Sequence, residues 1–599
     1  MHIMDINYAL KFITRILPVM VFLIFLSCTS KKEVTVNELH NHIEYLSSDS
    51  LKGRLAGSPG DSLAAEYIKH ELSSYGLIPL SGDGFQRFSV TSRLVSGKEN
   101  TLTIDRVNFI PEKDFMPFAF SSNSGLESEV IFTGYGFKID EDSLRWNDYQ
   151  GIDIKGKWAM MLRADPETDK SMSHFIPFSG DRDKAMLAKD MGAAGVLLVS
   201  GSVFDPQDTF ESLNSGDFSV DIPVFRIKRE LADLILSKTG TTIAGLEKKL
   251  NDTRVPSSFA SGTVVNGKAE VIRELNSTRN VVMILPGEDE QLKNEFIIIG
   301  AHMDHLGMGG PGSSSMAGDT VAVHHGADDN ASGVGMMLEL AEKFALTKGS
   351  HKRSIICIAF AGEELGLLGS KYFVENPGID LTKVNAMINL DMIGRLPETN
   401  VLQISGTGTA EGLKELIVSE SDTNLISLVF SDEGYGRSDH ASFYGKNIPV
   451  LFYFTGAHLD YHKPTDTYDR INYRGMVTIS SLIFNVTGKL ASSPEGLQFR
   501  EAGPKPETGR ITRKKIITLG IMPDFAGIVK NGLRADEVYP GRPAAQGGMK
   551  KGDIITGING KIINNIQDYM FRLGQIKYGQ VITVEVLRDN NKIVLLIQL

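Results

Sequence analysis

The sequence predicts an α/β fold, with a mostly parallel or mixed sheet and helices on both faces, joined to two further domains. Apolar runs alternate with helical patterns between residues 270 and 491, and this alternation is typical of such a sheet. Short strand-like runs replace it over residues 101–269, which indicates a β-rich insert. A polar stretch that contains Pro and Gly, residues 492–512, predicts a linker to a last domain at 513–599.

The first residues, 1–28, have the pattern of a targeting segment. Lys11 and Arg15 precede the short apolar run Ile16–Leu26, and Ser27-Cys28 follow it. The run is too short for a bilayer, which takes roughly 20 apolar residues. The pattern resembles the lipobox of bacterial lipoproteins and implies a signal peptide that ends in a diacylated Cys28. We therefore expect a lipoprotein anchored in a membrane of the bacterial cell envelope and facing the periplasm or the exterior, with secretion as the alternative.

Residues 33–100 form the start of the scaffold. Apolar residues recur at helical spacing from Val36 to Leu46, and a glycine-punctuated loop follows. A second helix pattern comes next, and Asp61 or Ser62 is expected to cap it.

Composition indicates a globular protein and limits its partners. The chain has 599 residues, of which 42% are hydrophobic and 23% charged, enough for three or four domains. Its net charge of −11 and isoelectric point of about 5.7 argue against nucleic acid as a partner.

Chemistry-bearing residues follow the apolar runs of the predicted sheet. Phe296–Ile299 is followed by Gly300-Ala301 and then by His302 and Asp304. On extended backbone, a spacing of two places both side chains on one face, so an imidazole and a carboxylate can address one point. A glycine-rich loop then leads to Asp329 and to a helix from about Ser332.

Three later segments repeat the pattern. Glu363-Glu364 follow the run Ser354–Phe360, Asp391 follows Val384–Leu390, and His462 lies beyond Ile448–Phe454. Each has an ordinary explanation when taken alone: a solvated acidic pair, a helix N-cap and a structural histidine. Because ligands bind beyond the carboxyl ends of strands in such sheets, the coincidence favours one shared site.

The candidate ligands suit a pair of metal ions. They comprise two imidazoles and three carboxylates: His302, Asp329, Glu364, Asp391 and His462. Such a set can hold two borderline divalent ions, with one carboxylate bridging them and an open position for water on each. Zinc is the expected metal because His and Asp/Glu are its ligands, so we predict two Zn²⁺ ions per chain.

Five motifs in this order, HMDH, GADDNASG, FAGEELGLLGS, NLDMIGR and DYHKPTDT, resemble the co-catalytic di-zinc aminopeptidases of clan MH, relatives of the glutamate carboxypeptidases. The resemblance covers roughly residues 35–100 and 270–490, and the peptidase domain is expected at 33–100 and 270–491. It implies a zinc peptidase domain and a metallo-aminopeptidase that hydrolyses N-terminal residues from peptide substrates.

The resemblance also implies roles for individual residues. His302 and Asp391 would hold one zinc, Glu364 and His462 the other, and Asp329 would bridge them.

Three further residues receive catalytic roles by the same resemblance. Glu363 would be the general base, Asp304 would orient His302, and Tyr461 would stabilise the oxyanion.

Two other stretches resemble known domains. The segments GYGF and AKDMGAAGVLLVS within 101–269 resemble those of a protease-associated domain, which implies a role in substrate access. The segment 513–599 resembles a PDZ domain, and Leu519-Gly520-Ile521 resembles the loop that binds a peptide C-terminus. A packed appendage without a ligand is the alternative for this last domain.

Other functions are possible on the same predicted fold. One is a carboxypeptidase or a glutaminyl cyclase, although the cyclases use one zinc and this chain keeps all five ligands. Another is a non-catalytic binding protein of the transferrin-receptor kind, against which the intact Glu363 counts.

The lipobox predicts that Cys28→Ala releases the protein from membranes. The diacyl anchor is stable in a bilayer, whereas the protein without it has no such attachment. Fractionation of broken cells should move the variant to the soluble fraction. A variant that stays wholly in the membrane fraction would show that Cys28 is not the anchor.

Overall fold

The computed structural model describes residues 32–599 apart from 142–143, 169, 171–172, 212, 214–217, 311–312, 319, 503–516, 525–528, 530 and 578. The predicted targeting segment and Cys28 lie outside the described residues. Within the described part, every helix is too short or too polar to cross a membrane.

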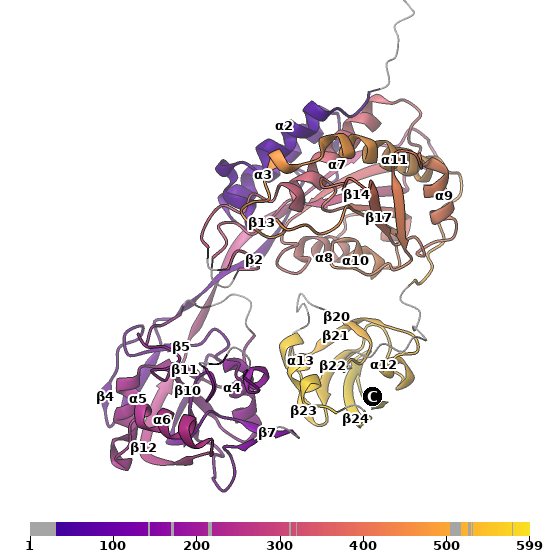
Figure 1. The fold of residues 1–599 in the computed structure, drawn as a ribbon. Coiled ribbons are helices and arrows are strands. Elements are labelled where there is room, and N and C mark those ends of the chain that lie inside the picture. Colours follow the sequence, from indigo (N-terminus) through magenta and orange to yellow (C-terminus); the bar gives the residue numbers. More distant parts are fainter. Residues whose placement is uncertain are drawn as a thin grey trace, which may run out of the picture.

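The central domain, residues 33–100 and 270–491, is built on a nine-stranded sheet (Figure 1). The four strands β15, β14, β16 and β19 run parallel to one another, whereas β13 and β17 pair antiparallel with the two outer ones. The predicted α/β class with a mostly parallel or mixed sheet is therefore confirmed. In spatial order the strands are β1 Ile78–Pro79, β13 Val271–Leu285, β15 Ser354–Phe360, β14 Phe296–His302, β16 Val384–Leu390, β19 Val450–Phe454, β17 Val401–Ser405 and β18 Ser427–Ser431, with β2 Phe85–Ser96 beside β13.

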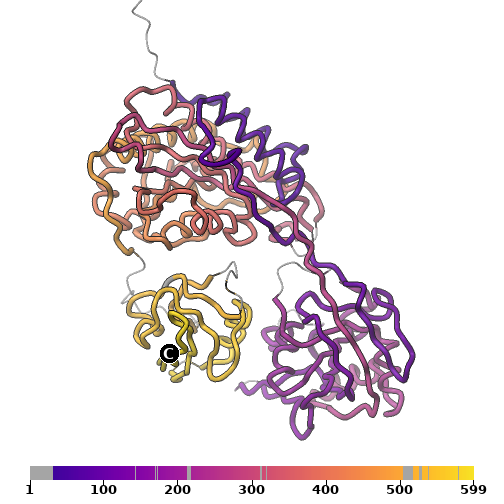
Figure 2. Tube along the Cα trace, turned by 180° about the vertical axis from the view of Figure 1, so that it is seen from behind, coloured from indigo at the N-terminus to yellow at the C-terminus, as the bar shows by residue number. Residues whose placement is uncertain are grey.

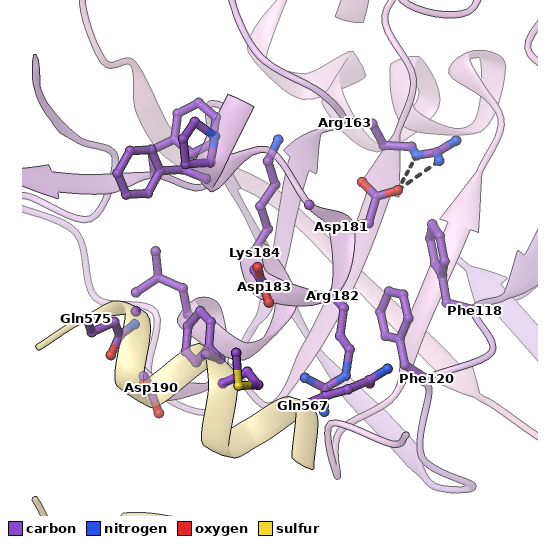
Figure 3. A pocket seen from close by; sticks show the side chains of 18 of the residues that line it. Phe118, Phe120, Arg163, Asp181, Arg182, Asp183, Lys184, Asp190, Gln567 and Gln575 are labelled. Atoms are coloured by element: carbon purple, nitrogen blue, oxygen red, sulfur yellow. Dashed lines mark hydrogen bonds and ion pairs between the residues drawn. The ribbon is translucent and has the colours of Figure 1, made fainter. Parts of the chain in front are cut away.

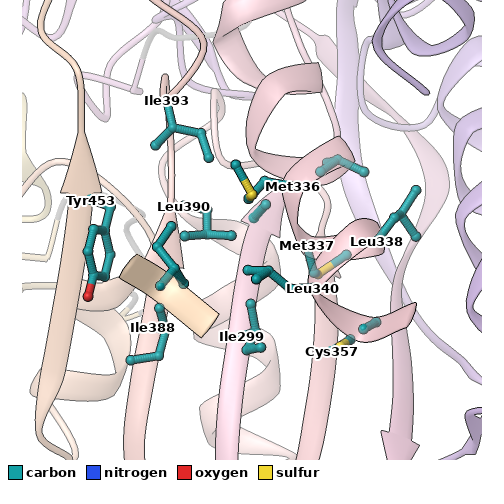
Figure 4. Packing of buried hydrophobic residues seen from close by; sticks show 14 of the residues in the cluster. Ile299, Met336, Met337, Leu338, Leu340, Cys357, Ile388, Leu390, Ile393 and Tyr453 are labelled. Carbon is teal, nitrogen blue, oxygen red and sulfur yellow. The ribbon is translucent and has the colours of Figure 1, made fainter. Parts of the chain in front are cut away.

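Helices cover both faces of this sheet. The strand period of two explains why, since Ile297 and Ile299 of β14 enter one hydrophobic cluster and Ile298 enters the other. Figure 4 shows Ile299 among the side chains of the first cluster, with Met336 and Met337. The first cluster is covered by α2 Val36–Leu46, α3 Pro59–Ser74, α7 Gly333–Leu346, α9 Leu413–Glu420 and α11 Tyr473–Ser492, and the second by α8 Leu368–Glu375 and α10 His440–Tyr444.

The cap predicted for α3 is wrong by one turn. The helix begins at Pro59, and the Ser58 side chain accepts a hydrogen bond from the Asp61 backbone amide. Proline at the first position has a preset φ and needs no hydrogen-bond donor, so the helix starts there. The carboxylate of Asp61 instead accepts hydrogen bonds from the Gly57 amide at 2.9 Å and from the Thr278 hydroxyl at 2.6 Å.

The inserted domain, residues 101–269, has its own eight-stranded sheet and a core around the buried Trp158. The long strands β2 and β13 pair side by side and lead from the central domain into it (Figure 2). Its elements in chain order are β3 Thr101–Ile104, β4 Val107–Asn108, β5 Phe115–Pro117, β6 Gly125–Thr133, β7 Lys138–Glu141, β8 Leu144–Asn147, β9 Trp158–Leu162, α4 Asp181–Asp190, β10 Gly195–Val199, β11 Val224–Ile227, α5 Arg229–Leu236, α6 Ile243–Thr253 and β12 Ser258–Lys268.

The C-terminal domain, described from residue 517 to 599 with the gaps given above, carries a six-stranded sheet in which β20 is an edge strand among the described residues. Of the preceding polar stretch, residues 503–512 lie outside the described part. The elements of this domain are β20 Ile521–Pro523, β21 Leu533–Val538, α12 Pro543–Gln546, β22 Ile554–Ile558, β23 Lys561–Ile562, α13 Ile566–Gly574, β24 Val581–Arg588 and β25 Asn591–Gln598.

Ion pairs hold the C-terminal domain against the inserted domain. Arg182 of α4 lies 2.6 Å from Asp568 of α13, and Arg572 of α13 pairs with Asp190. The two helices border a pocket of about 1390 Å³, in which Gln567 of α13 faces the inserted domain (Figure 3).

A second set of contacts joins the C-terminal domain to the central domain. Lys371 of α8 lies 2.9 Å from Asp524, and both side chains are largely buried. The hydroxyl of Tyr435 donates to the carbonyl of Asp536 at 2.8 Å. The C-terminal domain is therefore packed against α8, the helix that follows the Glu363-Glu364 turn.

Candidate active site

The five candidate ligands converge at the carboxyl edge of the central sheet. His302 is the last residue of β14, Asp391 directly follows β16, and Glu364 lies in the turn after β15. Asp329 precedes α7, and His462 comes from the loop after β19. Four parallel strands thus deliver side chains to one point, as expected for ligand sites in open α/β sheets.

Asp329 lies between two groups of ligands and divides its oxygens between them. His302 Nε2 lies 3.3 Å from Asp329 Oδ1 and 3.3 Å from Asp391 Oδ1. His462 Nε2 lies 3.3 Å from Asp329 Oδ2 and 3.3 Å from Glu364 Oε2.

These separations fit zinc. Two ligand atoms on one tetrahedral zinc, each at roughly 2.0–2.1 Å from the metal, lie about 3.3 Å apart. The donors are imidazole nitrogens and carboxylate oxygens, which zinc prefers. The residues present therefore fit two zinc ions, one on each side of the Asp329 carboxylate.

Asp466 holds Asp329 in place and has no role in the sequence-based prediction. Its Oδ2 accepts hydrogen bonds from the backbone amides of Asp328 at 2.9 Å and Asp329 at 3.1 Å. Its Oδ1 lies 3.3 Å from Arg395 Nη2. The DYHKPTDT motif contains this acid, but only the fold reveals what it contacts.

Asp304 is placed differently from the expected arrangement. Its Oδ1 lies 3.9 Å from His302 Nδ1, whereas its backbone carbonyl lies 3.2 Å from that nitrogen. The carboxylate instead accepts a hydrogen bond from the Glu363 amide at 3.1 Å. The carbonyl is thus the group of Asp304 positioned to orient the imidazole, and the carboxylate fixes the Glu363 turn.

Comparisons with known proteins assign two parts of the chain to known families. Residues 280–487 match the family model described as Peptidase family M28, and residues 503–599 match that of the PDZ domain. The chain combines an M28 peptidase domain with a PDZ domain. The predicted resemblance is therefore confirmed for these two domains, while the protease-associated domain stays a prediction.

The relatives are only distantly similar. Leucine aminopeptidase 2 of Arthroderma otae is 26% identical over 449 residues, which cover 64% of this chain and 83% of that protein. A probable leucine aminopeptidase of the same organism is 26% identical over 238 residues, which cover 38% of this chain and 62% of that protein. The aminopeptidase from Aneurinibacillus sp. strain AM-1 superposes with a TM-score of 0.45 at 23% identity, covering 80% of this chain and 98% of that one.

Arg54 fastens the scaffold of the M28 domain to its ligand loops. Its buried guanidinium donates to the carbonyls of Met303 and Gly326 at 2.9 Å each and of His325 at 2.8 Å, and also to Leu46. One side chain from the N-terminal segment thus fixes the loops on either side of the glycine-rich stretch.

His305 is a second site residue of the M28 domain without a predicted role. It is fully buried, and its Nδ1 lies 2.8 Å from Glu364 Oε1. The HMDH motif contains it, but its position one residue beyond Asp304 gave no reason to expect a contact with the turn after β15.

Charges within the M28 site shift several pKa values. Burial raises the pKa of Glu364, as does the charge of Asp329, but hydrogen bonds from His305 and His462 outweigh both and lower it to about 2. Burial lowers the pKa of His462, but the carboxylates of Asp329 and Glu364 raise it to about 10. Burial raises the pKa of Glu363 well above its usual range, and the carboxylates of Glu364 and Asp391 add to this.

Zinc binding to the metal-free protein should release protons. At pH 7 His462, with a pKa of about 10, carries a proton, but zinc takes the neutral imidazole. We expect release of about one proton or more per chain. Calorimetric titration at pH 7 in buffers of different ionisation enthalpy measures this number. Zinc uptake without proton release would contradict the assignment of His462 as a ligand.

Proposed function

We propose that the protein is a zinc-dependent exopeptidase, and specifically an aminopeptidase that hydrolyses N-terminal residues from peptides. The observation that carries this proposal is the pair of imidazole and carboxylate groups that share Asp329, with Glu363 beside them outside either group. The M28 match and the leucine aminopeptidase relatives support the same activity.

The contacts around Asp329 support the metal-binding roles that the resemblance implies. His302 and Asp391 would hold one zinc, Glu364 and His462 the other, and Asp329 would bridge them. Bound zinc would lower the pKa of a metal-held water from 15.7 towards roughly 7 and polarise the scissile carbonyl.

Glu363 is the residue best placed to act as general base. It adjoins the ligand Glu364, its backbone is held by the Asp304 carboxylate, and its side chain is only partly buried. In the metal-free protein, burial and the carboxylates of Glu364 and Asp391 raise its pKa, whereas the positive charge of bound zinc would favour its ionised form. Glu363 would take a proton from the attacking water and deliver it to the leaving amine, work typically worth about 10²–10⁴-fold in rate.

Tyr461 is a candidate for stabilising the oxyanion. Its ring stacks on that of His462, with centroids 3.8 Å apart. Burial raises the pKa of its hydroxyl, and the charges of Asp329 and Glu364 raise it further, so the group stays protonated. A neutral phenol can donate a hydrogen bond to developing negative charge on the carbonyl oxygen.

The PDZ domain, the targeting segment and the inserted domain would each have a supporting role in this function. A peptide C-terminus would bind along β20 of the PDZ domain, and the lipobox would tether the enzyme to the cell envelope. The inserted domain would limit access of peptides to the site.

Replacing Glu363 should separate catalysis from metal binding. Glu363→Gln keeps size but removes the base, so we expect kcat to fall by at least about 10² while zinc content stays normal. Glu364→Gln should lose zinc and activity together. Zinc stoichiometry beside kcat for both variants is the measurement. Near-normal turnover of Glu363→Gln with full zinc would place the base elsewhere.

Matched peptides can test whether the protein cleaves at the N-terminus or at the C-terminus of its substrate. We expect the zinc-loaded protein to release the N-terminal residue from free peptides and to leave N-acetylated copies intact. Mass spectrometry of the products identifies the end that is cut. Release of C-terminal residues from both sets would instead indicate a carboxypeptidase.

A further inference from the structure

The contacts of His305 point to a role that neither the motifs nor the M28 match assigns. Its ring is fully buried and lies against Glu364, with Nδ1 2.8 Å from Oε1. Its other nitrogen, Nε2, is buried and has no hydrogen-bond partner among the described residues. We propose that His305 is a positioning residue, which donates from Nδ1 to Glu364 Oε1 and thereby aims Oε2 at the metal shared with His462. This inference rests on the proposed metal site.

The distances favour a hydrogen bond over metal ligation by His305. Two ligands of one tetrahedral zinc lie about 3.3 Å apart, and His462 keeps that distance of 3.3 Å from Glu364 Oε2. The 2.8 Å between His305 and Oε1 is instead typical of a hydrogen bond to a carboxylate. Oε1 of Glu364 thus accepts the hydrogen bond from His305, and Oε2 is left to bind the metal shared with His462.

Contacts with the backbone and the ring of His305 hold this residue in a fixed position. Its backbone amide donates to the Arg54 carbonyl at 3.2 Å. A side chain on Gly326 would place its Cβ 2.6 Å from His305 Cδ2, so the chain passes against the ring with no room for a side chain. The ring meets His462 edge to face at 5.8 Å. Because the imidazole is fixed in place, its hydrogen bond can fix the orientation of the Glu364 carboxylate.

Glu364 needs such a partner more than the other acidic ligands do. It is the one glutamate among the three carboxylate ligands, so it has one more rotatable bond than Asp329 or Asp391 and more rotamer entropy to lose on binding metal. Partners that hydrogen-bond a metal ligand are typically worth about 10–100-fold in metal affinity. The effect should fall on the ion held with His462 and spare the ion held with Asp391.

The test compares variants that keep or remove the donor. His305→Leu removes it, whereas His305→Asn places an amide N–H near the position of Nδ1. We expect His305→Leu to weaken one of the two bound zincs by about 10–100-fold and His305→Asn to restore most of that loss. Competition with a chelator at buffered free zinc gives both affinities without reference to activity. His324→Asn is a matched control, because the described hydrogen bonds of the His324 side chain go to Ser315 and Ala322 and to none of the proposed ligands.

Each outcome bears on the proposal. Wild-type affinity at both sites in His305→Leu would overturn it, and so would a loss in His305→Asn as large as in His305→Leu, which would indicate metal ligation. If His305→Leu does not fold, His305→Gln replaces it, because its amide extends past the Nδ1 position and should not restore the hydrogen bond. Failure of the wild-type chain to bind two zincs would refute the proposed metal site itself, which is a separate result.

Discussion

A cluster of buried and partly buried carboxylates at one edge of the central sheet is the constraint on which the site depends. Burying charge is costly unless cations compensate it. Arg54 and Arg395 lie at the margin of the cluster, and the imidazoles of His302 and His462 lie inside it. Despite burial, the carboxylates of Asp329 and Glu364 raise the pKa of His462, so they favour its protonated, positively charged form. The cluster comprises Asp304, Asp328, Asp329, Glu363, Glu364, Asp391, Asp439 and Asp466.

The surrounding fold determines the positions of the ligands in this cluster. His302, Glu364 and Asp391 lie at or just beyond the ends of β14, β15 and β16, so the sheet positions their backbone. Asp329 precedes α7, and His462 lies in the loop after β19. Around them, Asp466 holds the Asp329 backbone, His305 contacts Glu364, and Arg54 joins the loops. The PDZ domain packs on α8 through Lys371 and Asp524, so its contact surface begins a few residues beyond Glu364.

Strand-end residues were predictable from the sequence, and contacts between distant segments were not. A buried run followed by an acid or a histidine indicates both a strand and a ligand, which is how His302, Glu364 and Asp391 were found. Asp329 instead follows a glycine-rich loop. Arg54 lacks such a signal, and the contact of His305 with Glu364 joins two segments that only the fold brings together. The expected cap of α3 failed because Pro59 set the helix start. The carboxylate of Asp304 turned towards the Glu363 amide, which only the turn geometry reveals.

The central claim is that Asp329 bridges two metal ions. A crystal structure of the zinc-loaded protein, with anomalous data on both sides of the zinc edge, tests this most directly. We expect two zinc peaks on opposite sides of the Asp329 carboxylate, one next to His302 and Asp391 and the other next to His462 and Glu364. A single peak, or a second peak away from Asp329, would contradict it.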